Sequence, residues 1–324
     1  MHPKAGHPVD ASSLTDISEL ISLYYETEPD LTDPAQQVAF GTSGHRGTSL
    51  NGSFTEDHIM AITQAICEYR KAQGIHGPLF IGRDTHALST PALKSAVQVF
   101  AANGVTLMLD RDHGYTPTPV ISHAILSYNQ GRDDEHADGV VITPSHNPPT
   151  DGGFKYNPPH GGPADTAATT WIAKRANELL AENNNQVESI YYPDALAAET
   201  TLSYDYITPY VEDLKNVINM EAIVEADLSI CADAMGGAGG AYWHAIRDTY
   251  DSTWIFVMMS LIPPMPSCTA ITTEKLAWIV PLLLPWPDLS NLKTTMISPL
   301  ETTPILIGMG LLLPPAVCSI PTTT

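Results

Sequence analysis

Helix and strand signals alternate along the first 250 residues, and this alternation constrains the fold more than any other feature of the sequence. Stretches with apolar residues three and four positions apart predict helices, and short apolar runs between them predict buried strands. The expected helices cover residues 16–25, 55–74, 89–103, 119–128, 165–182, 206–217 and 241–250, and the expected strands 79–82, 105–109, 139–143 and 228–232. This order is typical of βαβ units, so we predict an α/β fold.

Turn and capping residues indicate where several of these elements begin and end. Thr55 is a suitable N-cap for the second helix, and Gly74 ends it because glycine tolerates the left-handed backbone of a C-cap. Asp165 is expected to cap a long helix that the three asparagines at 183–185 interrupt. Residues 186–203 show no clear periodicity, and we expect a linker there.

Composition changes sharply near Tyr250. Residues 251–324 contain 11 proline, 11 threonine and 12 leucine residues but no histidine or arginine. Proline at this density removes hydrogen-bond donors and interrupts helices and central strands. The apolar runs, such as Ile305–Leu313, are too short to cross a bilayer, which argues against a membrane hairpin. This tail does not show the pattern of a folded domain.

The charge and cysteine content exclude several classes of protein. A net charge of −21 opposes binding to nucleic acid or to an anionic membrane surface. The chain shows no signal peptide pattern and no long apolar span, so we expect a soluble, cytoplasmic protein. Cys67, Cys231, Cys268 and Cys318 form no CxxC pair, so we expect free thiols. The 12 histidines show no spacing typical of a metal site.

Four short segments rich in glycine, hydroxyl or basic residues adjoin the expected strands, and we interpret them as loops. They are Phe40–Gly47, Gly82–His86, Thr143–Pro148 and Gly152–Tyr156. Loops at strand ends bind ligands in α/β proteins, and glycine lets backbone N–H groups approach an anion. Because the cations Arg46, Arg83 and Lys155 occur here in an acidic chain, these segments favour a phosphate-bearing ligand over ordinary turns.

Ser145 is the most specific of these candidates. It follows an apolar strand and lies between Pro144 and a His-Asn-Pro sequence, so its hydroxyl is expected to be exposed and held still. Such a serine suits a nucleophile or a phosphoryl carrier. No G-x-S-x-G elbow occurs, which disfavours a serine hydrolase. The glycine-rich turn at 233–240 matches neither complete nucleotide-binding motif, so we interpret it as a tight turn and weakly as a phosphate nest.

The order and spacing of the four segments resemble the α-D-phosphohexomutase superfamily over about residues 1–250. The long run Thr143–Pro163, with its Asn-Pro-Pro-His-Gly-Gly-Pro extension, is similar to the bacterial, glucose-phosphate-specific phosphoglucomutase branch. The resemblance implies three α/β/α layers in a first domain at 1–200 and the start of a second α/β/α domain at 201–250. Residues 251–324 would be an aberrant tail.

The resemblance also implies roles for individual residues. Ser145 would be a phosphoserine that exchanges its phosphoryl group with glucose 1-phosphate and glucose 6-phosphate through glucose 1,6-bisphosphate. Arg46 would face this group, and Lys155 would transfer a proton at the sugar hydroxyl, which requires a lowered pKa. The remaining expected site residues are His146 and Asn147, which would shape the serine loop, and Thr42, Ser43, Arg83 and Asp84, which would surround the phosphate.

One part of the family pattern is missing from this chain. Members bind Mg²⁺ through the phosphoserine and three aspartates of an Asp-x-Asp-x-Asp-Arg loop, and no such loop occurs here. The sugar-binding loop of the third domain and the phosphate-binding fourth domain are also missing. We therefore expect an incomplete Mg²⁺ site with only Ser145 as a ligand, and a chain that is inactive as it stands.

A shifted reading frame explains this difference. Reading the tail one base earlier joins the last base of each codon to the first two bases of the next. Glu301–Gly310 can then encode Asn-Asp-x-Asp-x-Asp-Arg-His-Gly, and Thr273–Asp288 can encode a second family-like stretch in the same frame. The tryptophan codons at Trp278 and Trp286 force one Asp and one Ala in that stretch. We therefore hypothesise a frameshift near residue 251.

Alternative functions remain open at the level of the sequence. A phosphomannomutase or a phosphoglucosamine mutase would share the serine loop, because the third-domain loop that discriminates between sugars is missing. A non-catalytic remnant that binds phosphate or nothing is a different class of protein. The DNA upstream and downstream would distinguish these alternatives.

Overall fold

A computed structural model describes residues 14–41, 44–226, 231–234 and 236–251, together with five short strands between residues 255 and 313. The chain divides into two compact units. One unit comprises residues Thr15–Tyr206, and the other comprises Met1–Leu14 with Ile207–Thr324. Each unit is described by itself.

A six-stranded sheet forms the centre of the unit Thr15–Tyr206, in the order β1-β5-β4-β2-β3-β6. Its strands are β1 (Gly44–Thr48), β2 (Leu79–Arg83), β3 (Leu107–Asp110), β4 (Asp138–Ile142), β5 (Asp151–Asn157) and β6 (Thr201–Tyr204). Strands β4, β2, β3 and β6 are parallel to one another, whereas β5 is antiparallel to both β4 and β1. The predicted α/β class is therefore confirmed, with a mixed sheet.

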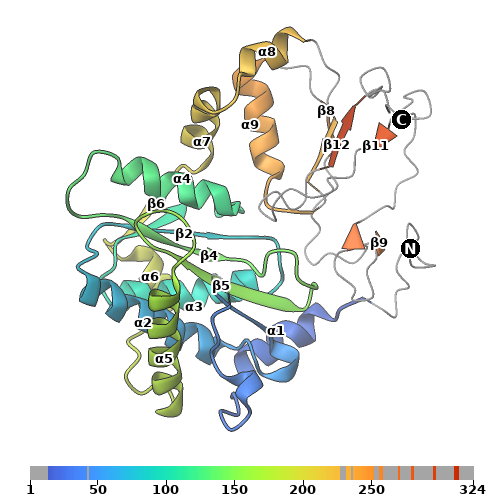
Figure 1. Ribbon diagram of the computed structural model, residues 1–324. Helices are drawn as coiled ribbons and strands as arrows, with labels where there is room; N and C mark the ends of the chain where they lie inside the picture. Colours follow the sequence, from blue (N-terminus) through green and yellow to red (C-terminus); the bar gives the residue numbers. More distant parts are fainter. Residues whose placement is uncertain are drawn as a thin grey trace, which may run out of the picture. The chain divides into compact units, whose positions relative to one another are not determined.

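Helices cover both faces of this sheet, which gives the three expected layers. Figure 1 shows α4 (Thr118–Asn129) on one face, and α2 (Glu56–Gln73), α3 (Ser89–Ala102) and α5 (Thr166–Ala181) on the other. Helix α2 packs between α3 and α5. The remaining elements are α1 (Ile17–Glu26), α6 (Tyr192–Ala197) and the short 3₁₀ helices η2 (Pro34–Gln36) and η3 (Ser49–Asn51).

Local sequence signals account for the ends of these helices. The Thr55 side chain and His58 form a capping box at the start of α2, and Gly74 ends the helix with a φ of 68°. Asp165 accepts a hydrogen bond from the Ala168 N–H at the start of α5. Asn183 adopts a left-handed conformation just after that helix ends. These caps confirm the expected bounds.

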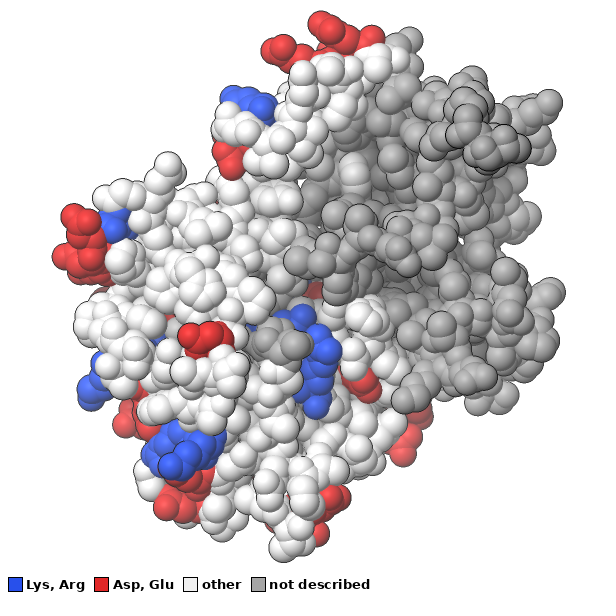
Figure 2. Space-filling view, viewed as in Figure 1, with Lys and Arg blue, Asp and Glu red and all other residues white. Residues whose placement is uncertain are grey.

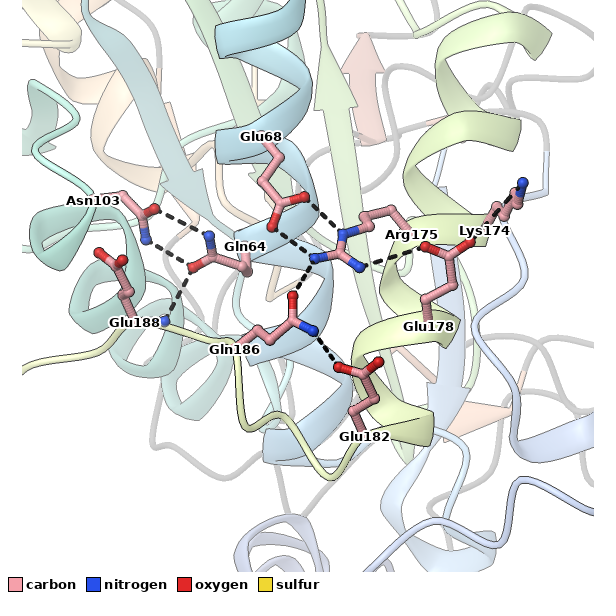
Figure 3. Close-up of polar contacts among 9 residues, drawn as sticks. All are labelled: Gln64, Glu68, Asn103, Lys174, Arg175, Glu178, Glu182, Gln186 and Glu188. Carbon is pink, nitrogen blue, oxygen red and sulfur yellow. Dashed lines mark hydrogen bonds and ion pairs between the residues drawn. The ribbon is translucent and has the colours of Figure 1, made fainter.

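The linker expected at residues 186–203 is wrong, because α6 and β6 lie in this segment and β6 is the sixth strand of the sheet. Figure 3 shows how side chains attach it to the helical layer. Arg175 on α5 donates to Glu68 on α2 at 2.7 Å and to Gln186 at 2.9 Å, and the Glu188 N–H donates to Gln64 at 3.2 Å. The contacts of Arg175 with Glu68 and of Glu188 with Gln64 join residues more than one hundred positions apart in sequence, so local periodicity could not indicate them.

The unit Ile207–Thr324 contains a second βαβ element. Strand β7 (Cys231–Asp233) leads to helix α9 (Gly240–Tyr250) and then to β8 (Ile255–Val257), which is parallel to β7. Before it come α7 (Ile207–Asp213), η4 (Leu214–Asn216) and α8 (Met220–Glu225), and after it β9 (Thr269–Ala270), β10 (Ile279–Val280), β11 (Thr295–Met296) and β12 (Gly310–Leu313). The second unit thus begins as the sequence predicts, and β8 continues it past residue 251.

Strand β12 is antiparallel to β7 and to β11, and β9 pairs with β10. The expected absence of a packed core after residue 251 concerns side chains that lie outside the described residues. The domain boundaries at residues 200 and 250 stay predictions, although the first compact unit ends at Tyr206.

Two findings concern the classes of partner that the composition disfavours. Among the described residues, no helix is long and apolar enough to cross a membrane. On the face drawn in Figure 2, the described lysine and arginine side chains lie in a few separate groups between acidic ones. They do not form the continuous basic stripe that is typical of a nucleic-acid interface.

Candidate active site

The serine loop, Thr143–Pro148, follows β4 at its carboxyl end. All five residues of β4 are buried, so the loop leaves the sheet from a fixed position. Ser145 has a φ of 74°, which is a left-handed conformation that costs energy for a residue with a side chain. Its N–H donates to the Thr143 hydroxyl at 2.9 Å, and its Oγ lies 3.5 Å from Nδ1 of the exposed His146. Ser145 itself is partly exposed, as predicted for a residue that reacts.

Two of the four segments interpreted as loops are strands. Residues 44–47 of the first lie in β1, and the last lies within β5. Glycine usually weakens a strand, which is why the sequence indicated loops here. At Gly153, however, a Cβ atom would lie 2.2 Å from the Thr143 carbonyl oxygen and 2.6 Å from the Pro144 Cα. The glycine therefore lets the serine loop pack directly on β5.

The pairing of β1 with β5 places Arg46 and Lys155 on one face of the sheet. Gly44 is opposite Lys155, and Arg46 is opposite Gly153. Residues two positions apart on a strand share a face, so Arg46 and Lys155 are diagonal neighbours. Because Gly153 lies under the serine loop, both cations belong to the part of the sheet on which that loop packs.

Lys155 is a buried cation, with only 9% of its surface exposed. Burial, followed by the positive charge of Arg46, lowers the pKa of Lys155 to about 8, and Asp84 acts in the opposite direction. An amine with such a pKa can give and take a proton near neutral pH. Arg46, by contrast, is exposed and keeps its guanidinium available to an anion.

Arg83 and Asp84 lie at the carboxyl end of β2, next to β4. The Asp84 N–H donates to the Ile142 carbonyl at 3.0 Å, which holds this turn beside the start of the serine loop. Arg83 turns away to the loop after β3, where it donates to the His113 carbonyl at 2.9 Å and stacks over the Tyr115 ring at 4.4 Å. The structure therefore joins Asp84 to the serine loop, and Arg83 to a different loop.

Asn147 and His86 complete the hydrogen bonding of the serine loop. The Asn147 side chain donates to Asp151 at 2.9 Å, and His86 Nε2 lies 3.3 Å from the Asn147 carbonyl. The sequence pattern assigns no role to His86 or Asp151. The sequence indicates His86 only weakly. It lies in the segment Gly82–His86 but contacts the serine loop about sixty residues later in the chain. Thr42 and Ser43 lie outside the described residues.

The described residues do not assemble a metal site. Among them, no group of three or more histidine, cysteine, aspartate or glutamate side chains could hold an ion. Ser145 is the one metal ligand that the family resemblance predicts here, and two described acidic residues near the serine loop, Asp84 and Asp151, are engaged in hydrogen bonds. The described residues therefore do not fit a complete Mg²⁺ site.

Comparison with known proteins gives these observations a family context. Residues 37–183 match the family model described as phosphoglucomutase/phosphomannomutase, alpha/beta/alpha domain I. The chain is 56% identical over 268 residues to a protein of Komagataeibacter xylinus named phosphoglucomutase. It is 30% identical over 202 residues to one of Thermococcus kodakarensis named phosphoglucomutase/phosphomannomutase.

The chain covers only part of each relative. The alignments take in 83% and 62% of this chain but 48% and 40% of those two proteins, so the chain spans less than half of either. Among solved structures, a phosphomannomutase homologue from Thermus thermophilus matches with a TM-score of 0.56 and 24% identity, covering 69% of this chain and 46% of that one. That likeness concerns the fold.

Proposed function

Because residues 37–183 match domain I of the phosphoglucomutase/phosphomannomutase family, we propose that this chain is related to that family and that Ser145 is the phosphoryl carrier of a phosphoglucomutase. The substrates would be glucose 1-phosphate and glucose 6-phosphate, with glucose 1,6-bisphosphate as the intermediate. The observation that carries this proposal is the buried Lys155, whose lowered pKa and place beside Arg46 suit proton transfer next to a phosphorylated serine.

Each residue would have a distinct part in the transfer. The bond between Ser145 Oγ and phosphorus breaks as the sugar hydroxyl oxygen forms a new bond to phosphorus, and the hydroxyl proton passes to Lys155 Nζ. With a pKa of about 8, Lys155 is neutral, and able to accept that proton, in about a tenth of molecules at pH 7. Arg46 would offset the charge on the phosphoryl oxygens, which this reaction needs more than covalent help.

The identity of the sugar rests on the relative from Komagataeibacter, which is named a phosphoglucomutase and shares 56% of aligned residues. Phosphomannomutase activity is the second candidate, supported by the name of the Thermococcus relative. Comparing rates with glucose 1-phosphate and mannose 1-phosphate would decide between them. A cytoplasmic location also stays a prediction, and the relatives from Arabidopsis thaliana and Pisum sativum are named cytoplasmic.

We further propose that Mg²⁺ is required and that its aspartate ligands are encoded in the shifted reading frame of residues 251–324. One base restored near residue 251 would supply them. The described acidic residues do not replace these ligands, because none forms a metal-binding cluster with Ser145. The chain as given would then be a non-catalytic form of the enzyme.

The test compares two variants of the frame-restored protein by intact mass and by mutase rate. Ser145→Ala should remove both the bound phosphate and the rate, because the carrier is gone. Lys155→Met should keep the phosphate while the rate falls by about 10²-fold or more, since only the proton-transfer group is lost. If Ser145→Ala kept its phosphate and its rate, Ser145 would not be the carrier.

A further inference from the structure

Asp84 connects to the serine loop on both sides of Ser145. Its carboxylate accepts from His86 Nδ1 at 2.8 Å and from the Ser89 hydroxyl at 2.6 Å, and it also bonds the Thr143 side chain. Only 14% of the Asp84 side chain and 7% of the His86 side chain are exposed. A carboxylate with this many partners is a rigid acceptor, because its oxygens are fixed in several directions at once.

One connection reaches the amide of Ser145. The Thr143 hydroxyl can donate to Asp84 while its oxygen accepts the Ser145 N–H at 2.9 Å. The other connection passes through His86, whose Nε2 lies 3.3 Å from the Asn147 carbonyl, two residues beyond Ser145. Because Asp84 accepts the proton of Nδ1–H, Nε2 also carries a proton and donates to this carbonyl when the ring is doubly protonated.

Ser145 needs such support because of its backbone conformation. A φ of 74° is unfavourable for serine, and a strained residue persists only where its surroundings hold it. Within the loop, Asn147 is also held by Asp151 at 2.9 Å. The two connections from Asp84 approach Ser145 from opposite sides along the chain, so together they restrict the φ and ψ angles of the loop.

We propose that Asp84 and His86 are a positioning pair that holds the serine loop in its left-handed conformation at Ser145. Neither residue contacts a reacting atom, so both act through the loop. The importance of this position for catalysis rests on the proposed function, in which Ser145 carries a phosphoryl group. The pair would orient Ser145 Oγ for in-line transfer, a reaction that depends mainly on positioning.

The charged groups around His86 make this pair observable by titration. Burial lowers the pKa of His86, but Asp84 outweighs burial and raises it, with a smaller contribution from Asp151. Burial raises the pKa of Asp84, but His86 and the hydrogen bonds outweigh burial and lower it. Lys155 also lies within the field of Asp84. His86 therefore becomes protonated at a higher pH than an isolated histidine would.

The experiment follows the His86 ring and the amides of Ser145 and Asn147 by NMR on the isotopically labelled 324-residue chain, from about pH 5 to about pH 8. In the wild-type chain, both amides should shift with the midpoint of His86. Asp84→Asn should lower that midpoint by about one pH unit. Ser89→Ala is the matched control, because it removes a partner of Asp84 that does not contact the loop, and it should leave the coupling in place.

Two substitutions of His86 separate positioning from simple packing. His86→Ala should broaden or split the amide signals of Ser145 and Asn147, because the donor to the Asn147 carbonyl is lost. His86→Gln should restore a single sharp set, since its amide nitrogen can donate from about the same place, but without any titration. Unchanged amides in α2 and α5 would show that each variant remains folded.

The proposal is overturned if the amide signals of Ser145 and Asn147 do not shift with the midpoint of His86. It is also overturned if His86→Ala and His86→Gln give the same spectra as the wild-type chain. Should Asp84→Asn fail to fold, the comparison of His86→Ala with His86→Gln decides alone. Phosphate content and mutase rate play no part in this readout, so a failure of the proposed function would be seen separately.

Discussion

The described parts of the two units differ in the share of their apolar side chains that is buried. In Thr15–Tyr206, large residues such as Tyr24, Phe54 and Phe100 are fully buried, and the sheet has strands of four to seven residues. In the described part of Ile207–Thr324, Val217 is 79% exposed and Ile218 is 43% exposed, within one short stretch. Strands β7 and β8 have only three residues each.

This difference shows that a pattern of helices and strands specifies a stable core only when the packing partners are present. The first unit contains residues 37–183, which match the model of the family's domain I, and its helices pack against one another and against the sheet. The second unit contains the same kind of βαβ element, formed by β7, α9 and β8. The composition of the sequence changes at about residue 251, where α9 has ended.

The largest effect is expected from restoring the reading frame after the second unit begins. The 324-residue chain should show no mutase turnover above background with glucose 1-phosphate and Mg²⁺. The restored protein should be faster by about 10³-fold or more, because loss of a metal that neutralises the transferring group costs several kcal/mol. A coupled assay for glucose 6-phosphate measures both. Ordinary activity in the 324-residue chain would contradict the idea that the second unit is incomplete.

The next largest effect is expected from the buried ion pair of the first unit. Arg70 Nε donates to Asp138 at 2.9 Å, and the Tyr156 hydroxyl donates to the same carboxylate at 2.7 Å. Asp138→Ala leaves a buried cation without its partner and should lower the free energy of unfolding by about 3–5 kcal/mol. Chemical denaturation followed by circular dichroism measures this change.

The matched control for Asp138→Ala is the exposed pair of Arg111 and Asp205, in which half of the Arg111 side chain is exposed. Asp205→Ala should change the free energy of unfolding by less than about 1 kcal/mol, because solvent screens surface pairs. Equal effects of the two substitutions would show that burial does not set the stability of the first unit.

A smaller effect is expected from acid. Burial, and then the neighbouring His58, lower the pKa of His45 to about 4, whereas an unfolded histidine titrates near 6.5. The unfolded chain therefore takes up a proton between these values while the folded chain does not. Stability should be intact above about pH 6.5 and fall by about 3 kcal/mol as the pH drops through 4.

Unfolding curves at several pH values would measure this loss for the first unit. His45→Gln cannot titrate, so its stability should depend less steeply on pH between about 6.5 and about 4, even if it is lower throughout. If the wild-type chain and His45→Gln lost stability in parallel, another group would account for the acid sensitivity.

The smallest effect on stability is expected from the contacts of Arg175, which hold the segment after α5 to the helical layer. Arg175 joins α5, α2 and Gln186, as Figure 3 shows, and only 22% of its side chain is exposed. Arg175→Ala should destabilise the unit by about 1–2 kcal/mol and speed amide exchange in residues 186–190. Its neighbour Lys174, which is 79% exposed and 3.9 Å from Glu178, provides the control. Lys174→Ala should cost less than about 0.5 kcal/mol.

Features that depend on residues close together in the sequence could be predicted, and features that depend on distant residues could not. The bounds of α2 and α5 could be predicted because Thr55, Gly74 and Asp165 act on their own helix ends. The strand β6 could not, because it pairs with β3 about ninety residues earlier and has only four residues. Ser145, Arg46 and Lys155 were predicted to lie in segments that bind a phosphate-bearing ligand. Their roles in catalysis stay proposals.

The sequence by itself determined the α/β class, the main helices and the serine loop, since these depend on local dihedral preferences, caps and apolar periodicity. Only the tertiary structure decided that β1 and β5 are strands. Glycine usually weakens a strand, but Gly153 is needed in β5 because the serine loop packs directly on it. The tertiary structure alone also decided the lowered pKa of Lys155 and the link from Asp84 through His86 to Asn147. Burial and contacts between distant strands create these properties, and neither is encoded in a short window of sequence.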